Sequence, residues 1–127
     1  MKKIYLGGTE NSKWREKFID KLDASTETFI PDLISMSSKQ ASASDTILHV
    51  FTPESDNILE TVELMLNLVK YPKRVIFTFF DFGGQTFNEN QVKCLKQVGR
   101  TVDNCGGHWA LTMLEVIHLL TSKEQLC

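Results

Sequence analysis

Short apolar runs alternate with stretches of helical periodicity along the whole chain. The apolar runs predict strands at residues 3–8, 28–33, 46–52 and 74–80, and "GGHWAL" at 106–111 predicts a short last strand or a turn. Apolar residues at helical spacing predict helices at 12–22, 57–70, 87–102 and 112–122. Residues 34–45 are rich in serine and alanine and predict a mobile loop or a short helix.

The alternation of strands and helices predicts an α/β domain whose parallel sheet carries helices on both faces. Residues 46–52 and 74–80 are apolar on both sides, as central parallel strands are. Pro31 interrupts the run 28–33, which places that strand at an edge. Because crossovers between parallel strands are right-handed, we predict a flavodoxin-like three-layer sandwich with a five-stranded parallel sheet of order 2-1-3-4-5.

Length and composition narrow the class of protein. The 127 residues predict one domain, residues 1–127, and the 42% hydrophobic and 24% charged residues are typical of a globular protein. A net charge of -2 gives no general attraction to nucleic acid or to an anionic membrane, and no apolar run is long enough to span one. Cys94, Cys105 and Cys127 lack paired spacing, so we expect reduced thiols in a cytoplasmic protein without a metal site or a cofactor.

In an open parallel sheet, ligands bind at the carboxyl ends of the strands. That rule selects residues 7–9, 52–57 and 81–86. Gly7 and Gly8 allow the backbone to approach a ligand, and the helix that follows offers free N–H groups to an anion. Arg15 is placed to reach back towards a phosphate or carboxylate. The alternative is an ordinary glycine turn beside a solvated Arg15, because the pattern is neither G-x-G-x-x-G nor a P-loop.

The predicted helix 57–70 has unusual amphipathicity. Glu60, Glu63 and Asn67 cluster on one side, and Glu63 lies nearest the apolar border, where partial desolvation suits a nucleophile or a general base. The alternative is that these acids form a solvated face. The broad apolar face opposite them is made by Ile58, Leu59, Val62, Met65, Leu66 and Val69.

This amount of apolar surface is either deeply buried or packed against another subunit, so we expect a homodimer that uses this helix. His49, inside the central strand, is expected to be a packed core or interface residue rather than a catalyst.

An ordered series of motifs resembles the nucleoside 2-deoxyribosyltransferase-like family over almost the whole chain. The motifs are "IYLGGT" followed by "WR", "SDTILHVFTPES", "RVIFTFF", "GGQTFNENQVKCLKQVG" and "NCGGHWALTMLEVIHLL". The resemblance implies chemistry at the N-glycosidic bond of a small-molecule nucleoside or nucleotide, with Glu63 as the nucleophile at C1′. Glu60, one turn earlier, is the competing candidate, and Asp45 matches an acid that helps to handle the base. The substrate-binding residues implied in this way are Tyr5, Gly7, Gly8, Thr9, Trp14, Arg15, Pro53, Asn57 and Glu60.

Two other functions stay open at this point. The chain carries Asn57 where the transferases have an acid, and Ile30 where closer relatives have asparagine. These departures favour a module that binds a nucleotide or an ADP-ribose-like signal without cleaving it. The third possibility is an interaction protein that uses only the apolar helix surface.

Overall fold

The fold is given by a computed structural model, which describes residues 2–10, 12–22, 25–30 and 38–126. The strands are β1 (Lys2–Gly8), β2 (Thr26–Phe29), β3 (Thr46–Phe51), β4 (Val75–Phe79) and β5 (His108–Trp109). The helices are α1 (Trp14–Ile19), α2 (Ser38–Ser42), α3 (Ile58–Lys70), α4 (Glu89–Asn104) and α5 (Met113–Leu126), with a 3₁₀ turn, η1 (Pro72–Arg74), after α3.

The five strands form one parallel sheet of order β2-β1-β3-β4-β5, so the predicted flavodoxin-like order is confirmed. β3 lies at the centre and is buried along its whole length, which explains its apolar sequence on both faces. β2 lies at an edge, as predicted, although Pro31 itself lies outside the described residues.

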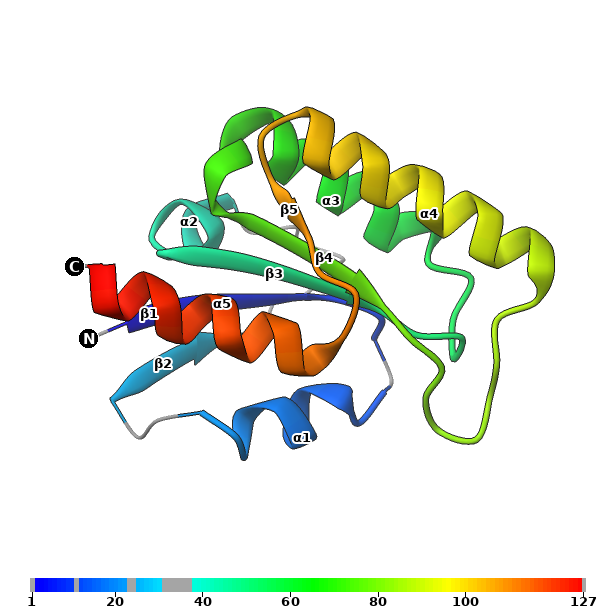
Figure 1. Cartoon of the computed structure of the whole chain (residues 1–127), viewed down its shortest axis with the longest axis horizontal. Coiled ribbons are helices and arrows are strands. Elements are labelled where there is room, and N and C mark those ends of the chain that lie inside the picture. The colour runs from blue at the N-terminus through cyan, green and yellow to red at the C-terminus, as the bar shows by residue number, and fades with distance from the viewer. Residues whose placement is uncertain (1, 11, 23–24, 31–37, 127) are drawn as a thin grey trace.

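Each face of the sheet has its own apolar core. The core on the α1 and α5 side contains Trp14, Phe18, Val116 and Leu120, packed on alternate residues of β1 and β3. The core on the other side packs α2, α3 and α4 against the remaining strand positions. Figure 1 shows α1 and α5 on one side of the sheet and α3 and α4 on the other, which is the predicted three-layer sandwich.

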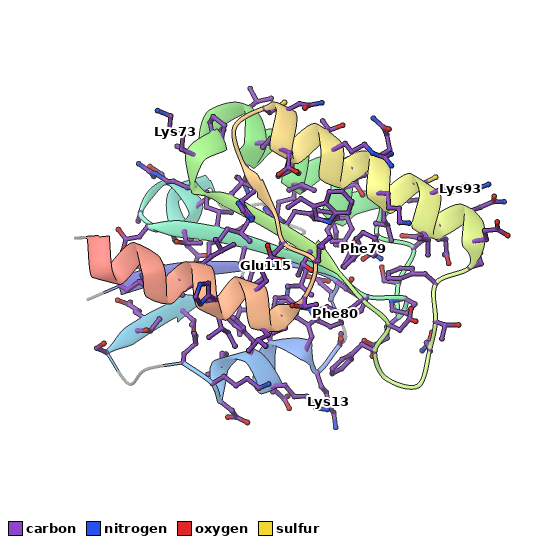
Figure 2. The ribbon with its side chains drawn as sticks, viewed as in Figure 1. Lys13, Lys73, Phe79, Phe80, Lys93 and Glu115 are labelled. Carbon is purple, nitrogen blue, oxygen red and sulfur yellow. The ribbon has the colours of Figure 1, made fainter. Side chains whose placement is uncertain are left out.

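Strand alternation sends consecutive side chains into different layers. Phe79 packs in the core beneath α3 and α4, whereas Phe80 packs against the core beneath α1 and α5 (Figure 2). Phe79 also stacks on Trp109, with 6.3 Å between the ring centroids, and so joins β4 to the short strand β5. None of the helices in the described ranges has both the length and the apolar character that a membrane crossing requires.

Several boundaries differ from the predictions. α1 begins at Trp14 rather than at residue 12, and the Ser12 hydroxyl accepts only a long hydrogen bond, 3.4 Å, from the Trp14 amide. The predicted strand 28–33 is observed as Thr26–Phe29, and its last three positions lie outside the described residues. Residues 34–45 contain a short helix, α2, which is one of the two alternatives predicted for this segment.

The orientation of α3 rules out the alternative that its acids form a solvated face. Glu60 and Glu63 are each 4% exposed, and Asn67 is also buried. The sheet-facing side is completed by Leu64 and Leu68, which are both buried. The broad apolar face points away from the sheet instead, and its exposed members are Ile58, Leu59, Val62, Leu66 and Val69.

Candidate functional site

The glycine turn at the end of β1 provides the space for the site. Gly7 pairs with His49 of β3, and a methyl group on Gly7 would lie only 2.7 Å from His49 Nδ1 and 2.9 Å from Glu63 Oε1. Only glycine therefore allows both side chains to occupy this position. Gly8 has a φ of 109°, and its α-carbon packs so closely on the Val50 backbone that a side chain would collide with it.

Glu63 is the central acidic group of this cluster. Neither carboxylate oxygen has a hydrogen-bond partner of normal geometry within the described residues. Burial raises the pKa of Glu63 to about 7, while the nearby Tyr5 hydroxyl and Arg15 guanidinium act in the opposite direction. A buried, unpaired carboxyl group is costly for folding, and such groups are concentrated at functional sites.

His49 lies beside Glu63 on the central strand and is fully buried. Burial, with a smaller effect from Arg15, lowers the pKa of His49 to about 3, so the imidazole is neutral near pH 7. Asn67 Nδ2 lies 3.2 Å from His49 Nε2, and an amide N–H donor there leaves the imidazole proton on Nδ1. That Nδ1 lies 3.9 Å from Glu63 Oε1, which is too long for a hydrogen bond.

Tyr5 completes the polar cluster from β1. It is 1% exposed, and its ring centroid lies 6.4 Å from that of His49. Burial and the charge of Glu63 raise the pKa of Tyr5, so the phenol stays protonated and able to donate a hydrogen bond. Glu60, one turn before Glu63, accepts a hydrogen bond of 3.0 Å from the Ser55 hydroxyl.

Arg15 is neither solvated nor free. It is 7% exposed and donates to the backbone carbonyls of Leu6, Gly8 and Thr9 at 3.0, 3.3 and 2.9 Å. The alternative of a solvated Arg15 is thus wrong. The guanidinium holds the glycine turn in shape and places a positive charge behind the site, instead of extending towards a ligand.

A second set of hydrogen bonds ties the β1 turn to the start of α3. The Thr9 hydroxyl donates a short hydrogen bond to Asn57 Oδ1 and accepts one of 2.8 Å from the Thr52 amide. Asn57 Nδ2 donates to the carbonyls of Thr52 and Ser55. Asn57 has left-handed backbone angles, with φ 58°, which asparagine tolerates better than most residues. Asn57 therefore fixes the loop beside the site.

Two predicted site residues lie elsewhere. Asp45 precedes β3 and accepts a hydrogen bond of 2.9 Å from the Lys3 amide, at the amino end of the sheet. Gly7 lies four positions after Lys3 in β1, or roughly 13 Å away at strand spacing, so Asp45 does not lie beside Glu63 to help handle the base, as the resemblance implies. Trp14 is a core residue of the opposite layer and donates its indole N–H to the Thr9 carbonyl.

Pro53, another predicted site residue, is half-buried in the turn after β3.

A groove of about 420 Å³ lies next to the cluster, between the amino ends of α3 and α4. Asn57 is shared by the groove and the loop network, but Glu63 does not line the groove. The groove walls include Asp56, Thr61, Phe87, Gln91, Leu95 and Val98.

Sequence reasoning missed the part that His49 plays in this site. The available signal was a polar side chain within an otherwise apolar central strand, opposite a glycine of the neighbouring strand in the predicted sheet. Asn67 and Glu63 lie on the same side of α3, as predicted, and that side is buried. The contact between Asn67 and His49 was not predicted, because it depends on which strand α3 packs against.

No protein-family model, curated protein or solved structure matched the chain. The residues that the structure describes include no cluster of three or more His, Cys, Asp or Glu side chains that would hold a metal ion. The fold and the cluster themselves define the class: an α/β domain with a buried acid at the carboxyl edge of a parallel sheet.

Proposed function

We propose that the protein acts on the N-glycosidic bond of a nucleoside or nucleotide, with Glu63 as the nucleophile at C1′. The observation that carries this proposal is the convergence of Gly7 with the buried Glu63 carboxylate. The resemblance of the motif series to the nucleoside 2-deoxyribosyltransferase-like family supports the same choice of substrate.

The reaction follows from the chemistry of a carboxylate beside an anomeric carbon. The Glu63 carboxylate attacks C1′ as the C1′–N bond breaks, and the bonding electron pair leaves with the base. The base takes up a proton from solvent as it departs, and the attacking water or second base gives up a proton to solvent in the second step. Water or a second base then attacks C1′, forms the new bond and releases the Glu63 carboxylate, which gives hydrolysis or transfer respectively.

The surrounding groups suit this role. Tyr5 offers a protonated hydroxyl beside the acid, and the neutral His49 presents its Nδ1–H on the other side. Both can donate to the carboxylate once the groups tighten around a substrate. The positive charge of Arg15 favours the ionised form of Glu63, which is the nucleophilic one.

The test is base release from a panel of nucleosides and nucleotides, followed by chromatography, with Glu63→Gln and Glu63→Ala. We expect both variants to lose activity by about a thousandfold or more, because the covalent step is removed. Glu60→Gln is the matched control on the same helix and should retain far more activity. Undiminished turnover by either Glu63 variant would exclude Glu63 as the nucleophile.

Binding without cleavage is the second candidate, and one observation favours it. Asn57 replaces an acid and is occupied by loop hydrogen bonds, and Asp45 lies at the far end of the sheet. The two further acids that the resemblance assigns to substrate handling are thus missing from the side of Glu63. Calorimetry with chromatography of the recovered ligand separates the two: tight binding with intact nucleotide after long incubation indicates a binding module.

We also propose a reducing, cytoplasmic location and a homo-oligomeric state. Cys94 and Cys105 are exposed free thiols, which persist most readily in a reducing compartment. The exposed apolar face of α3 supports self-association.

A further inference from the structure

A second pocket lies on the face of the sheet opposite to Glu63. It is enclosed by α1, by the residues that follow β4 and by the start of α5, and its volume is about 170 Å³. Figure 1 shows α1 and α5 together on that side of the sheet. The lining of this α1–α5 pocket consists of Trp14, Lys17, Phe18, Lys21, Phe80, Phe82 and Met113.

The apolar walls of the α1–α5 pocket suit one aromatic ring. Trp14 and Phe18 are each 1% exposed, and Phe80, Phe82 and Met113 are half-buried. The ring centroids lie 6.5 Å apart in the pair Trp14–Phe18 and 6.2 Å apart in the pair Phe80–Phe82. A ligand ring would find edges and faces of several rings to pack on. An apolar cavity of roughly 150 Å³ holds one benzene molecule, so this pocket has the volume for a single ring.

Both charged residues of the lining are basic. Lys17 lies on α1 and Lys21 lies two residues beyond its end, and both side chains are exposed. Lys17 Nζ lies 5.1 Å from the centroid of the Phe82 ring, so its ammonium group stands over one wall of the pocket. Among the residues that the structure describes, no carboxylate forms an ion pair with Lys17 or Lys21. Both ammonium groups are therefore available to an anion.

The acidic side chains nearby in the sequence do not line the α1–α5 pocket. Glu16 and Asp20 are exposed on α1 and at its end, outside the lining. Asp81, in the loop after β4, accepts a hydrogen bond of 2.9 Å from the Phe87 amide and is also outside the lining. A bound anion therefore meets two positive groups, whereas a bound cation would meet like charges.

We propose that the α1–α5 pocket binds a small aromatic carboxylate, with the ring against the aromatic walls and the carboxylate on Lys17 and Lys21. Apolar contact holds the ring, and the two ammonium groups select the charge. A carboxylate is favoured over a phosphate, because a dianion loses more hydration in an apolar pocket. With so few atoms in contact, we expect a dissociation constant of about 0.1–1 mM. The proposed reaction has no part in this inference, because α3, which carries Glu63, packs on the other face.

Titration with phenylacetate, followed by NMR of the two tryptophan indole N–H groups, tests the proposal. We expect the Trp14 signal to shift and to saturate with a midpoint of about 0.1–1 mM, while the signal of Trp109, which packs in the other layer, stays in place. Trp109→Phe assigns the two signals. Absence of a saturable Trp14 shift up to about 10 mM phenylacetate would overturn the proposal.

Three related probes test the chemical class of the ligand. Acetate carries the charge without the ring, and benzyl alcohol carries the ring without the charge. We expect each to bind at least about tenfold more weakly than phenylacetate, because each loses one of the two kinds of contact. Phenyl phosphate should bind no more tightly than phenylacetate. Equal binding of acetate or benzyl alcohol, or tighter binding of phenyl phosphate, would contradict the assignment to an aromatic carboxylate.

Removal of the two ammonium groups tests their role. Lys17→Gln combined with Lys21→Gln should weaken phenylacetate binding about tenfold and leave the binding of benzyl alcohol unchanged. The matched control is Lys93→Gln with Lys96→Gln, which changes the net charge equally at exposed positions of α4, where Figure 2 shows Lys93. Circular dichroism confirms that each variant is folded. An unchanged affinity in the first variant, or an equal loss in the control, would exclude the two lysines as the anion site.

Discussion

Glu63 lies in surroundings that favour its protonated form. Its pKa is raised to about 7 by burial, and the carboxylate oxygens gain no hydrogen bonds of normal geometry within the described residues. Folding thus removes the Glu63 carboxylate from water and replaces few of the hydrogen bonds that it made with water. The destabilising burial of Glu63 occurs where Gly7 leaves room beside the carboxyl group. Such destabilising burial is expected for a group that serves function rather than stability.

The stability of the protein should therefore depend on the charge of Glu63. Because the folded-state pKa is about 7 and the unfolded value about 4.5, stability falls as pH rises between these values. We expect Glu63→Gln to be more stable than the unchanged protein at pH 8, by up to about 3 kcal/mol, and similar to it near pH 4.5. Urea unfolding at both pH values measures this, with Glu16→Gln, an exposed carboxyl on α1, as the control. An equal difference at both pH values would contradict the prediction.

The same pKa sets the pH dependence of the proposed reaction. A nucleophilic carboxylate must be ionised, so kcat/KM should rise with pH and level off with a midpoint of about 7. A rate profile from pH 5 to 9 with a released-base assay measures the midpoint. A flat profile over this range would show that Glu63 is already ionised at pH 5 or does not take part.

At the scale of elements, helices approach the sheet closely only where small residues allow it. Gly99 of α4 lies against the Trp109 ring of β5, and a methyl group on Gly99 would fall 2.2 Å from Trp109 Cδ2. Trp109 in turn stacks on Phe79 of β4. The absence of one side chain thus lets α4 cover the short strand β5.

This close approach reverses the usual effect of glycine in a helix. Gly→Ala in a helix interior normally stabilises by about 1 kcal/mol. We expect Gly99→Ala to destabilise by about 1–3 kcal/mol instead, because the added methyl group collides with the indole. Thermal unfolding measures it, and Gln97→Ala, exposed on the same helix, should be nearly neutral. The penalty should shrink in a Trp109→Leu background, and stabilisation by Gly99→Ala would contradict the packing described.

At the scale of the whole molecule, the sheet brings together two buried groups whose titrations oppose each other. His49 has a folded pKa of about 3 against about 6.5 when unfolded, so its contribution to stability is lost as pH falls through that range. The contribution of Glu63 changes in the opposite sense between about 4.5 and 7. Between about pH 4.5 and 6.5 both groups titrate, and their opposite effects on the unfolding free energy partly cancel.

Removing the Glu63 carboxyl group should make the effect of His49 titration on stability measurable. In a Glu63→Gln background, we expect stability to fall steadily from about pH 6.5 towards pH 4, because only the unfolded chain binds the His49 proton. The slope of the unfolding free energy against pH measures this, and adding His49→Gln should flatten it. A slope unchanged by His49→Gln would assign the acid sensitivity to other groups.

The local pattern of the chain determined the elements and their order. Doubly apolar runs predicted β3 and β4, and helical spacing predicted α3 to within one residue, because these signals depend on neighbours along the sequence. The right-handed crossover rule then sufficed for the sheet order. Glu63 was identified in the same way, from its place at the border between two kinds of side chain.

Only the tertiary structure decided which side of α3 is covered. Periodicity divides a helix into two faces but does not state which one meets the sheet, and here the polar side with Glu60 and Glu63 faces inward. The burial of Arg15 against backbone carbonyls and the distance of Asp45 from Glu63 depend likewise on contacts between distant segments. The physical reason is the same in each case: burial and hydrogen bonding are properties of the packed chain, and no local pattern encodes which segment lies opposite.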